Sequence, residues 1–345
     1  MEFDTQLKKY KVQIDRLLVE CLELERGRAS TVSPGNIKIL DFIITFCTRG
    51  GKRIRPILFI KGYESVGGKN ISEATRTSIC IELLEAFLLI HDDIIDRDPI
   101  RRGGPSFHEM AKEWINDSHF GISSAIIAGD MISNLATKVI MGSNFSESAK
   151  LQALQEFIEA ELNCFHGELY DVILEREDVS EEKYMIMVDL KTSSYTTKAP
   201  LVMGAILGNG SEEQIELLRE YGKFLGRAFQ ITDDILGTFG DEKSTGKPTA
   251  SDIRQGKKTI LLIYALQHAN TKDNTSLRKS VGNKELTPQQ IDEVRKIFVQ
   301  TGALDYAKAQ ALKYARRAQS IINTSNLKET EFLTQLANFV VNRTF

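Results

Sequence analysis

The sequence predicts an all-α protein, and three observations point to that fold class. Of the 345 residues 42% are hydrophobic, enough for a sizeable core, and only 7 are proline. Apolar residues recur at helical spacing along most of the chain, whereas alternating β-branched runs are few. No linker, repeat or low-complexity tract divides the chain. We therefore expect a single domain over residues 1–345, a helical bundle around a deep central cavity.

The expected helices can be justified in order along the chain. Leu7–Leu24 and Ile37–Thr48 carry apolar residues at helical spacing with polar residues between them. Ile79–Asp96 is mostly apolar before its acidic end, so protein must surround it. Phe120 to Met141 is the most membrane-like stretch, but Asp130 and several polar residues interrupt it, which favours a buried helix over a membrane span. The other expected helices are Gly121–Met141, Ser148–Leu174, Ser180–Leu190, Thr192–Leu207, Glu212–Leu236, Ile253–Ala269, Pro288–Thr301, Leu304–Ile322 and Glu329–Val341.

Two acidic clusters lie far apart in the sequence, and each follows an apolar run of helical character. The first contains Asp92, Asp93 and Asp96, and the second contains Asp233 and Asp234. Residues four apart lie on one face of a helix, so Asp92 and Asp96 should lie side by side. Adjacent carboxylates repel unless a cation joins them, and oxygen-only ligands suit Mg²⁺. The sequence therefore predicts that both clusters face a shared cavity and clamp a diphosphate through several metal ions.

Basic residues accompany both clusters. Three cations follow the glycine pair Gly50-Gly51, and two more follow the first acidic cluster almost at once. Fixed diphosphate anions are the natural partner for such groups. The alternative is an ordinary basic turn after Gly51 and ordinary surface lysines elsewhere. The cations concerned are Lys52, Arg53, Arg55, Arg101, Arg102, Lys191, Lys247 and Lys257.

The ordered series of these motifs resembles the isoprenyl diphosphate synthase family, from Gly50 to the final segment Phe339 to Arg343. The resemblance implies a Mg²⁺-dependent trans-prenyltransferase that condenses isopentenyl diphosphate with an allylic diphosphate: dimethylallyl, geranyl or farnesyl diphosphate. It also implies three Mg²⁺ ions per active site, pyrophosphate as the base, and a homodimer.

The resemblance also assigns roles to individual residues. It makes Asp92 and Asp96 metal ligands that Asp93 supports, and Asp233 the surest ligand of the second cluster. Asp234 belongs to the same cluster, and Asp241 either acts through water or is only a loop carboxylate. The isopentenyl diphosphate would be bound by Lys52, Arg55 and Arg102, with Arg53 in the same segment, and the allylic diphosphate by Arg101. The allylic carbon would be surrounded by Lys191, Thr192 and Gln230, while Lys247 and Lys257 stabilise the departing charge.

Three positions depart from the family pattern. The fifth position of the second acidic motif is Gly237 instead of aspartate, while Glu85 and Glu168 stand where the family commonly has Gln or His and Gln, respectively. Glu85 lies nearly two helical turns before Asp92 on the same face, close to the expected isopentenyl diphosphate site. A carboxylate there must be protonated or paired with a cation. If it lacked a full cationic partner, Glu85→Gln should lower the KM for isopentenyl diphosphate; both glutamates could also be tolerated changes at the edge of the site.

Product length depends on Phe87 and Leu88, five and four residues before Asp92. At about 1.5 Å of rise per residue they lie roughly 6 to 8 Å deeper in the cavity than the metal site. The family's eukaryotic farnesyl-type enzymes carry aromatic residues at both positions. One aromatic ring here predicts C15 to C20 products, with C20 slightly favoured. The alternative is that Phe87 is simply a core residue.

Composition restricts the remaining possibilities. A net charge of −3 gives no sign of nucleic-acid binding. The four cysteines have no metal-ligand spacing, and the N-terminus lacks a signal-peptide pattern, so we expect free thiols and a cytoplasmic protein. The histidines at positions 91, 108 and 166 lack zinc-ligand spacing and are expected to be ordinary polar residues.

Two other functions compete with the synthase. A terpene cyclase shares the fold and one aspartate-rich motif, but its second motif of Asn, Ser and Glu is not seen, and the cations after Gly51 would lack a purpose. A non-catalytic subunit of a heteromeric prenyltransferase would account for Gly237, Glu85 and Glu168, but the retained aspartates argue against it.

Overall fold

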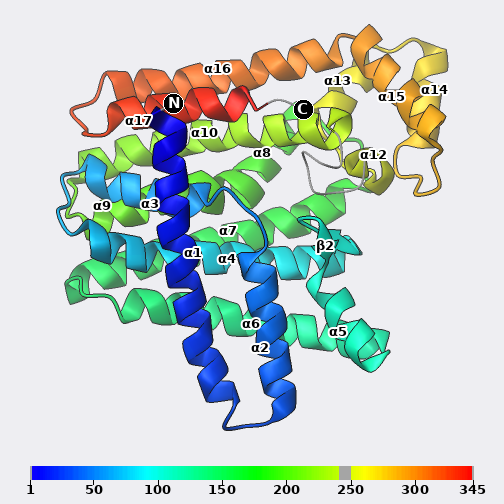
Figure 1. Ribbon diagram of the computed structural model, residues 1–345. Coiled ribbons are helices and arrows are strands. Elements are labelled where there is room, and N and C mark those ends of the chain that lie inside the picture. Colours follow the sequence, from blue (N-terminus) through cyan, green and yellow to red (C-terminus); the bar gives the residue numbers. More distant parts are fainter. Residues whose placement is uncertain (1, 241–249, 344–345) are drawn as a thin grey trace. The chain divides into compact units, whose positions relative to one another are not determined.

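The computed structural model describes residues 2–240 and 250–343, and it confirms the all-α prediction (Figure 1). In this part of the chain the strands are limited to one short antiparallel pair. The chain divides into two compact units. Unit 1 comprises residues 1–157 and 200–215, and unit 2 comprises residues 158–199 and 216–345. The boundaries fall within helices or at helix ends rather than in linkers, so the prediction of one domain stays a prediction.

Unit 1 contains the N-terminal helices. The short strands form a hairpin in which Ile100 pairs with Pro105 and Arg101 with Gly104. The elements of this unit are α1 (Glu2–Ala29), α2 (Pro34–Thr48), α3 (Ile54–Ser65), α4 (Ile71–Ile95), β1 (Ile100–Arg101), β2 (Gly104–Pro105), α5 (Phe107–Ile115), α6 (Ser118–Met141), the first part of α7 (Glu147–Leu174) and most of α9 (Ala199–Leu207).

Helix α4 is the centre of unit 1, as its apolar sequence predicts. It begins eight residues before the predicted start, because the Asn70 side chain caps it by accepting a hydrogen bond from the Glu73 backbone N–H. Its residues from Ile79 to Phe87 are buried. Helix α6 packs closely against it: a Cβ at Gly129 would collide with the His91 ring. The His91 Nε2 atom also lies 3.2 Å from the Ile126 carbonyl oxygen, so this histidine has the polar role expected of it.

Helix α6 is the one described helix that is long and apolar enough to cross a membrane. Length and composition are the whole basis of that finding, and a core helix of a soluble protein passes the same test. One face of α6 is buried through small residues such as Ala125, Ala128 and Gly129. Another face exposes Ile126 and Ile127.

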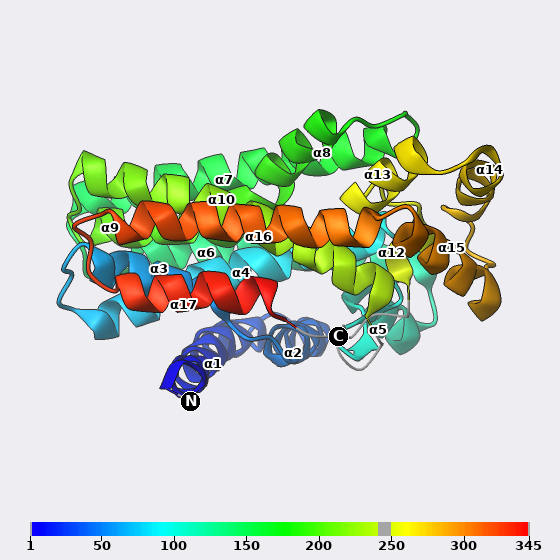
Figure 2. The ribbon, with the colours of Figure 1, turned by 90° about the horizontal axis from the view of Figure 1, so that it is seen from above.

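Unit 2 contains the C-terminal helices, with α16 and α17 running side by side (Figure 2). The remaining elements are the rest of α7, α8 (Glu181–Val188), the π-helix η1 (Asp189–Lys198), α10 (Glu212–Phe239), α12 (Ser251–Gln255), α13 (Ile260–His268), α14 (Thr271–Ser280), α15 (Pro288–Gln300), α16 (Ala303–Asn323) and α17 (Thr330–Val341).

The segment from Glu181 to Leu207 differs from prediction in its centre. Two helices meeting near Lys191 were expected, but the chain continues through α8, η1 and α9 without a break. Helical turns widened to the π form are rare and are frequent at functional sites. The π-helix contains both Lys191 and Thr192. The widened turns therefore occur where the resemblance places residues around the allylic carbon.

Other predicted boundaries were wrong for local reasons. The helix expected over Ile253–Ala269 is two helices, because Gly256 ends α12 at a φ of 82° and the Thr259 side chain caps the start of α13. Helices α3, α5 and α14 were not predicted. Each is short, and α14 is almost entirely polar with Leu277 as its buried residue, so its apolar periodicity was too weak to detect.

Candidate active site

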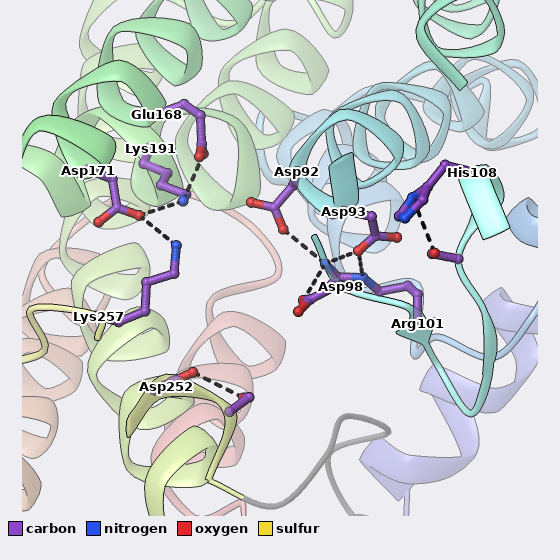
Figure 3. A network of polar contacts seen from close by, with 12 residues as sticks. Asp92, Asp93, Asp98, Arg101, His108, Glu168, Asp171, Lys191, Asp252 and Lys257 are labelled. Atoms are coloured by element: carbon purple, nitrogen blue, oxygen red, sulfur yellow. Dashed lines mark hydrogen bonds and ion pairs between the residues drawn. The ribbon is translucent and has the colours of Figure 1, made fainter. Parts of the chain in front are cut away.

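The first acidic cluster converges on one arginine of the β1–β2 hairpin (Figure 3). The Arg101 Nε atom donates to Asp93 Oδ1 at 2.6 Å, and Nη2 donates to Asp92 Oδ2 at 2.9 Å. The same Nη2 pairs with Asp98 Oδ2 at 3.6 Å. Burial disfavours the charged guanidinium, but the surrounding carboxylates outweigh it and raise the pKa of Arg101. A charge-assisted network therefore holds this cluster in place within unit 1.

The three predicted ligands of this cluster differ in accessibility. Asp93 has no exposed side-chain surface, whereas Asp92 is 19% exposed. Asp96 is the C-cap of α4 and is half-buried. This geometry favours Asp92 and Asp96 as ligands and Asp93 as the support that orients Arg101. Asp98 was missed by the sequence reasoning, because it lies beyond the helix and joins the network only through the hairpin.

The basic segment after Gly51 separates into inward and outward side chains. Lys52 is exposed, while the Arg53 side chain is fully buried and binds Asp15 and Glu82. Arg53 Nη2 also donates to the Cys47 carbonyl oxygen at 2.8 Å. These contacts favour a structural role for Arg53 over the substrate contact that its position in the motif suggested. Asp15 was not predicted, because it is one of several acids on an amphipathic helix, and Glu82 was not predicted, because nothing in the sequence of its apolar helix indicates a partner.

Glu85 joins two of the predicted substrate-binding arginines. Its Oε1 atom accepts from Arg55 Nη1 at 2.8 Å and from Arg102 Nη2 at 2.9 Å. Burial would raise the pKa of Glu85, but the two guanidinium groups outweigh it and lower the pKa. The carboxylate is therefore ionised and paired with cations. A carboxylate near a diphosphate was expected to be either protonated or paired in this way.

Backbone geometry explains how two loops of unit 1 present these arginines. Gly50 and Gly51 have φ values of 65° and 86°, in the left-handed region that glycine adopts at no steric cost. An added Cβ at Gly51 would lie 3.6 Å from the Arg102 guanidinium, so the two loops are in close contact. Arg49 fixes the hairpin by donating to the carbonyl oxygens of Arg101 and Pro105.

The second acidic cluster lies near the end of α10, and its two aspartates have different surroundings. Asp234 is buried and accepts from Tyr184 Oη at 2.6 Å and from Gln230 Nε2 at 2.7 Å. Burial, with a contribution from Asp252, raises the pKa of Asp234 to about 8. Asp233 is 41% exposed and lies 3.0 Å from Nη1 of Arg343. Asp233 is therefore the more accessible carboxylate, and Asp234 is held by the protein.

Thr192 and Gln230, which the resemblance places around the allylic carbon, are in contact with each other. The Thr192 hydroxyl donates to Gln230 Oε1 at 2.5 Å, and the same amide donates to Asp234. This arrangement fixes which end of the Gln230 amide faces each neighbour. Tyr184 completes the chain of hydrogen bonds, and nothing in its local sequence distinguished it from a core tyrosine.

Lys191 and Lys257 meet at Asp171 (Figure 3). Lys191 Nζ lies 2.7 Å from both Glu168 Oε2 and Asp171 Oδ2, and Lys257 Nζ lies 3.4 Å from the same Asp171 atom. Gly167 permits this contact, because a Cβ there would collide with the Lys191 backbone. Glu168 is thus compensated by a lysine, as Glu85 is by two arginines.

Five other residues with predicted roles complete the comparison with the sequence. Phe87 is 3% exposed, and its ring centroid lies 4.9 Å from that of His91. Leu88 is half-buried. Asp241 and Lys247 lie outside the described residues. The His108 Nδ1 atom lies 3.3 Å from Ser106 Oγ, within hydrogen-bonding distance. Burial lowers the pKa of His108.

The donors near both clusters fit Mg²⁺ in their chemistry. They are carboxylate oxygens, which this hard cation prefers. In residues 2–240 and 250–343 no group of three or more His, Cys, Asp or Glu side chains is arranged to hold an ion by itself. Mg²⁺ characteristically uses one or two carboxylates and completes its shell with water and substrate phosphates. The residues therefore fit a metal that binds together with a diphosphate.

Comparisons with known proteins identify the family. The sequence pattern of polyprenyl synthetases matches residues 38–298. The chain belongs to the polyprenyl synthetase family. It is 36% identical to a short chain isoprenyl diphosphate synthase of Methanothermobacter thermautotrophicus, over 99% of each chain. It is 35% identical to a geranylgeranyl diphosphate synthase of Saccharolobus solfataricus, over 86% of this chain and 87% of the relative.

Solved structures of this family have the same fold. A geranylgeranyl pyrophosphate synthase from Corynebacterium glutamicum, complexed with isoprenyl diphosphate and magnesium, matches with a TM-score of 0.93. It is 30% identical, and the match covers 98% of this chain and 99% of that one. Polyprenyl synthetases are prenyltransferases that condense isopentenyl diphosphate with allylic diphosphates, and Mg²⁺ dependence is a general property of the family. The family assignment made from the motifs is confirmed.

Proposed function

We propose that this polyprenyl synthetase makes a C15 to C20 prenyl diphosphate, with C20 slightly favoured. The observation that carries the synthase function is the Arg101 network. One guanidinium binds Asp92, which is predicted to hold metal, and Asp93, which is predicted to support it. Arg101 lies on the hairpin that also presents Arg102 to Glu85. The relatives named above, a short chain synthase and two geranylgeranyl synthases, support the product range.

The proposed reaction separates charge in an allylic diphosphate. Asp92 and Asp96, with Asp233, would hold Mg²⁺, three ions in all as the resemblance implies, and these supply Lewis acidity toward the leaving diphosphate. Arg101, Lys191 and Lys257 stabilise the same developing negative charge. The carbon–oxygen bond breaks and pyrophosphate departs with the electron pair.

The second substrate is oriented by the cations of unit 1. Lys52, Arg55 and Arg102 bind the diphosphate of isopentenyl diphosphate, and Glu85 fixes the two arginines beforehand. The double bond attacks the allylic carbon, and a proton then leaves for pyrophosphate, which is released. The hydrogen-bonded pair Thr192 and Gln230 presents polar oxygens that stabilise the allylic cation. Exclusion of water protects that cation, and the predicted cavity would provide it.

We also infer a homodimer and a cytoplasmic location. Helix α7 exposes an apolar stripe in its unit 2 portion, with residues spaced alternately by four and three. Such spacing is typical of helices that pack against helices. Exposed apolar patches of this kind mark protein interfaces. All four cysteines are free thiols, which suits a reducing compartment. The stripe comprises Ile158, Leu162, Phe165, Leu169 and Val172, which are 36% to 63% exposed.

An assay of the purified chain alone tests the function. We expect Mg²⁺-dependent condensation of isopentenyl diphosphate with dimethylallyl, geranyl or farnesyl diphosphate, and chromatography of dephosphorylated products gives the length. Cyclic hydrocarbon products would indicate a cyclase. No turnover until a second subunit is added would indicate a partner subunit. Light scattering of wild type and Leu162→Glu tests the dimer, which the charge should dissociate.

A further inference from the structure

The π-helix η1 packs closely against α10 within unit 2, because two glycines of α10 permit the approach. A Cβ on Gly226 would lie 2.6 Å from Ser193 Cα, and a Cβ on Gly222 would lie 2.7 Å from Lys198 Cα. Real Cβ atoms almost never have contacts so short, so both positions require glycine as long as the helices keep this spacing. The two helices therefore meet backbone to backbone, and a small shift of one would change the side-chain contacts between them.

One ion pair joins the start of η1 to α10 in a fixed orientation. The Arg227 Nε atom donates to Asp189 Oδ1 at 2.7 Å, and Nη2 donates to Asp189 Oδ2 at 2.6 Å. Two parallel bonds from a planar guanidinium fix direction as well as distance, which a single ammonium contact does not. The Arg227 side chain is 18% exposed, and its Cζ atom lies 5.4 Å from the centre of the Tyr314 ring and 5.7 Å from that of Phe224. The neighbouring rings thus restrict the guanidinium further.

This ion pair lies close to the two side chains that the resemblance places around the allylic carbon. Asp189 is three residues before Thr192 on η1, and Arg227 is three residues before Gln230 on α10. Both intervals are shorter than one helical turn. The Thr192 hydroxyl donates to Gln230 Oε1 at 2.5 Å, so the two helices are joined twice within one turn. A change in the first link would therefore move the groups that make the second.

We propose that Arg227 is a positioning residue for the reaction at the allylic carbon. By holding Asp189, it fixes η1 against α10 and so keeps Thr192 and Gln230 in place. This inference rests on the proposed function, because it assumes that these two side chains surround that carbon. Arg227 acts through its neighbours and does not touch the substrate. Misplacing a positioned group by about 1 Å can cost about a hundredfold in rate, so a weakened ion pair should slow the chemical step rather than weaken substrate binding.

Steady-state kinetics of the full chain with isopentenyl diphosphate and geranyl diphosphate tests the proposal. Arg227→Lys keeps the charge but cannot form two parallel bonds, and it should lower kcat by about tenfold to a hundredfold. Both KM values should stay within about threefold of wild type. Lys223→Gln is the matched control. Lys223 lies about one turn earlier on α10, is 46% exposed and reaches Asp189 Oδ2 at 3.6 Å, so its loss should change little.

A double-mutant cycle separates positioning from a merely structural role. Thr192→Val removes the hydroxyl that bonds to Gln230, so the contact that Arg227 is proposed to position is already lost. In that background Arg227→Lys should lower kcat by less than about threefold further, because residues that act as a unit have non-additive effects. A structural role would lower kcat equally in both backgrounds.

Each outcome bears on the proposal. A folded Arg227→Lys protein with the kcat of Lys223→Gln would overturn it, and so would a change confined to KM or a full loss of kcat in the Thr192→Val background. Thermal unfolding midpoints identify a variant that has merely lost stability. In that event Asp189→Asn, which breaks the ion pair but leaves the guanidinium beside its aromatic neighbours, takes the place of Arg227→Lys. If wild type shows no turnover, the proposed function fails and this inference with it; if wild type is active and Arg227→Lys matches it, only this inference fails.

Discussion

The two aspartate-rich segments begin alike in sequence but are built differently. In α4 the carboxylates of Asp92 and Asp93 share one buried guanidinium, that of Arg101. In α10 the buried Asp234 is bound by two neutral groups, and the exposed Asp233 faces Arg343. Both segments thus combine a buried aspartate with a more accessible one, but the buried aspartate is paired with a guanidinium in the first segment and with neutral donors in the second. Two adjacent aspartates can therefore be held by different kinds of partner in two segments of one chain.

The largest expected effects come from the accessible aspartates. Asp92→Asn and Asp233→Asn should each lower turnover by about a hundredfold or more with the fold intact, because charge stabilisation in the transition state is lost. Steady-state kinetics at saturating Mg²⁺ and substrates measures this, with circular dichroism to verify folding. Asp178→Asn, at an 87% exposed side chain, is the control. Near-normal turnover in either folded variant would contradict the metal assignment.

The arginines that face the two segments should differ next. Arg101→Gln removes the shared partner of Asp92 and the buried Asp93 and should lower kcat by about a hundredfold. Arg343→Gln removes the pair with Asp233, which is 41% exposed, and the contact with the Phe229 ring. Exposed ion pairs are worth little, so kcat should stay within about threefold. Measuring both variants under identical conditions sharpens the comparison. Equal losses would show that Arg343 also acts on the substrate, and the asymmetry described above would then be wrong.

The extent to which the sequence predicted this site follows the same division. Spacing along one helix was sufficient to place Glu85 and Asp92 on α4 and Asp96 at its end, because α4 is regular and long. It was insufficient for Asp98, since this residue reaches the Arg101 network through a turn whose path depends on tertiary contacts. The π-helix was also missed, because widened turns leave no apolar periodicity to detect. The fold class needed only that periodicity, whereas helix ends depended on single residues such as Asn70 and Gly256.

The residues upstream of the two segments differ as well, and Glu85 is the first to test. Seven residues before Asp92 lies Glu85, while seven before Asp233 lies Gly226, which packs against Ser193. The sequence allowed a lower KM in Glu85→Gln if the carboxylate were uncompensated. Because Arg55 and Arg102 both bind it, we now expect the KM for isopentenyl diphosphate to rise by about threefold to tenfold with kcat nearly unchanged, as expected when a charged hydrogen bond that orients the arginines is lost.

Glu82 provides a matched control for that variant, one turn earlier on α4. Glu82→Gln weakens the buried pair with Arg53 and should cost stability, up to about 3–5 kcal/mol, without a specific change in KM. Thermal unfolding and substrate titration of both variants separate the two roles. A KM that falls in Glu85→Gln would show that the carboxylate opposes diphosphate binding in spite of its partners.

The smallest expected change is in product length, by one or more C5 units, and it depends on Phe87. Five residues before Asp92 this ring is buried against His91, whereas five before Asp233 the chain has only Ala228, so a block to chain growth is expected on α4. Truncating a floor residue opens space for the growing chain, so Phe87→Ala should shift products upward by one or more C5 units. Phe59→Ala, at a fully buried ring on α3, should instead cost about 3–5 kcal/mol of stability and leave the length unchanged. Chromatography of dephosphorylated products from wild type and both variants distinguishes these outcomes. If Phe87→Ala loses stability like Phe59→Ala and keeps the wild-type length distribution, Phe87 is a core residue and the floor lies elsewhere.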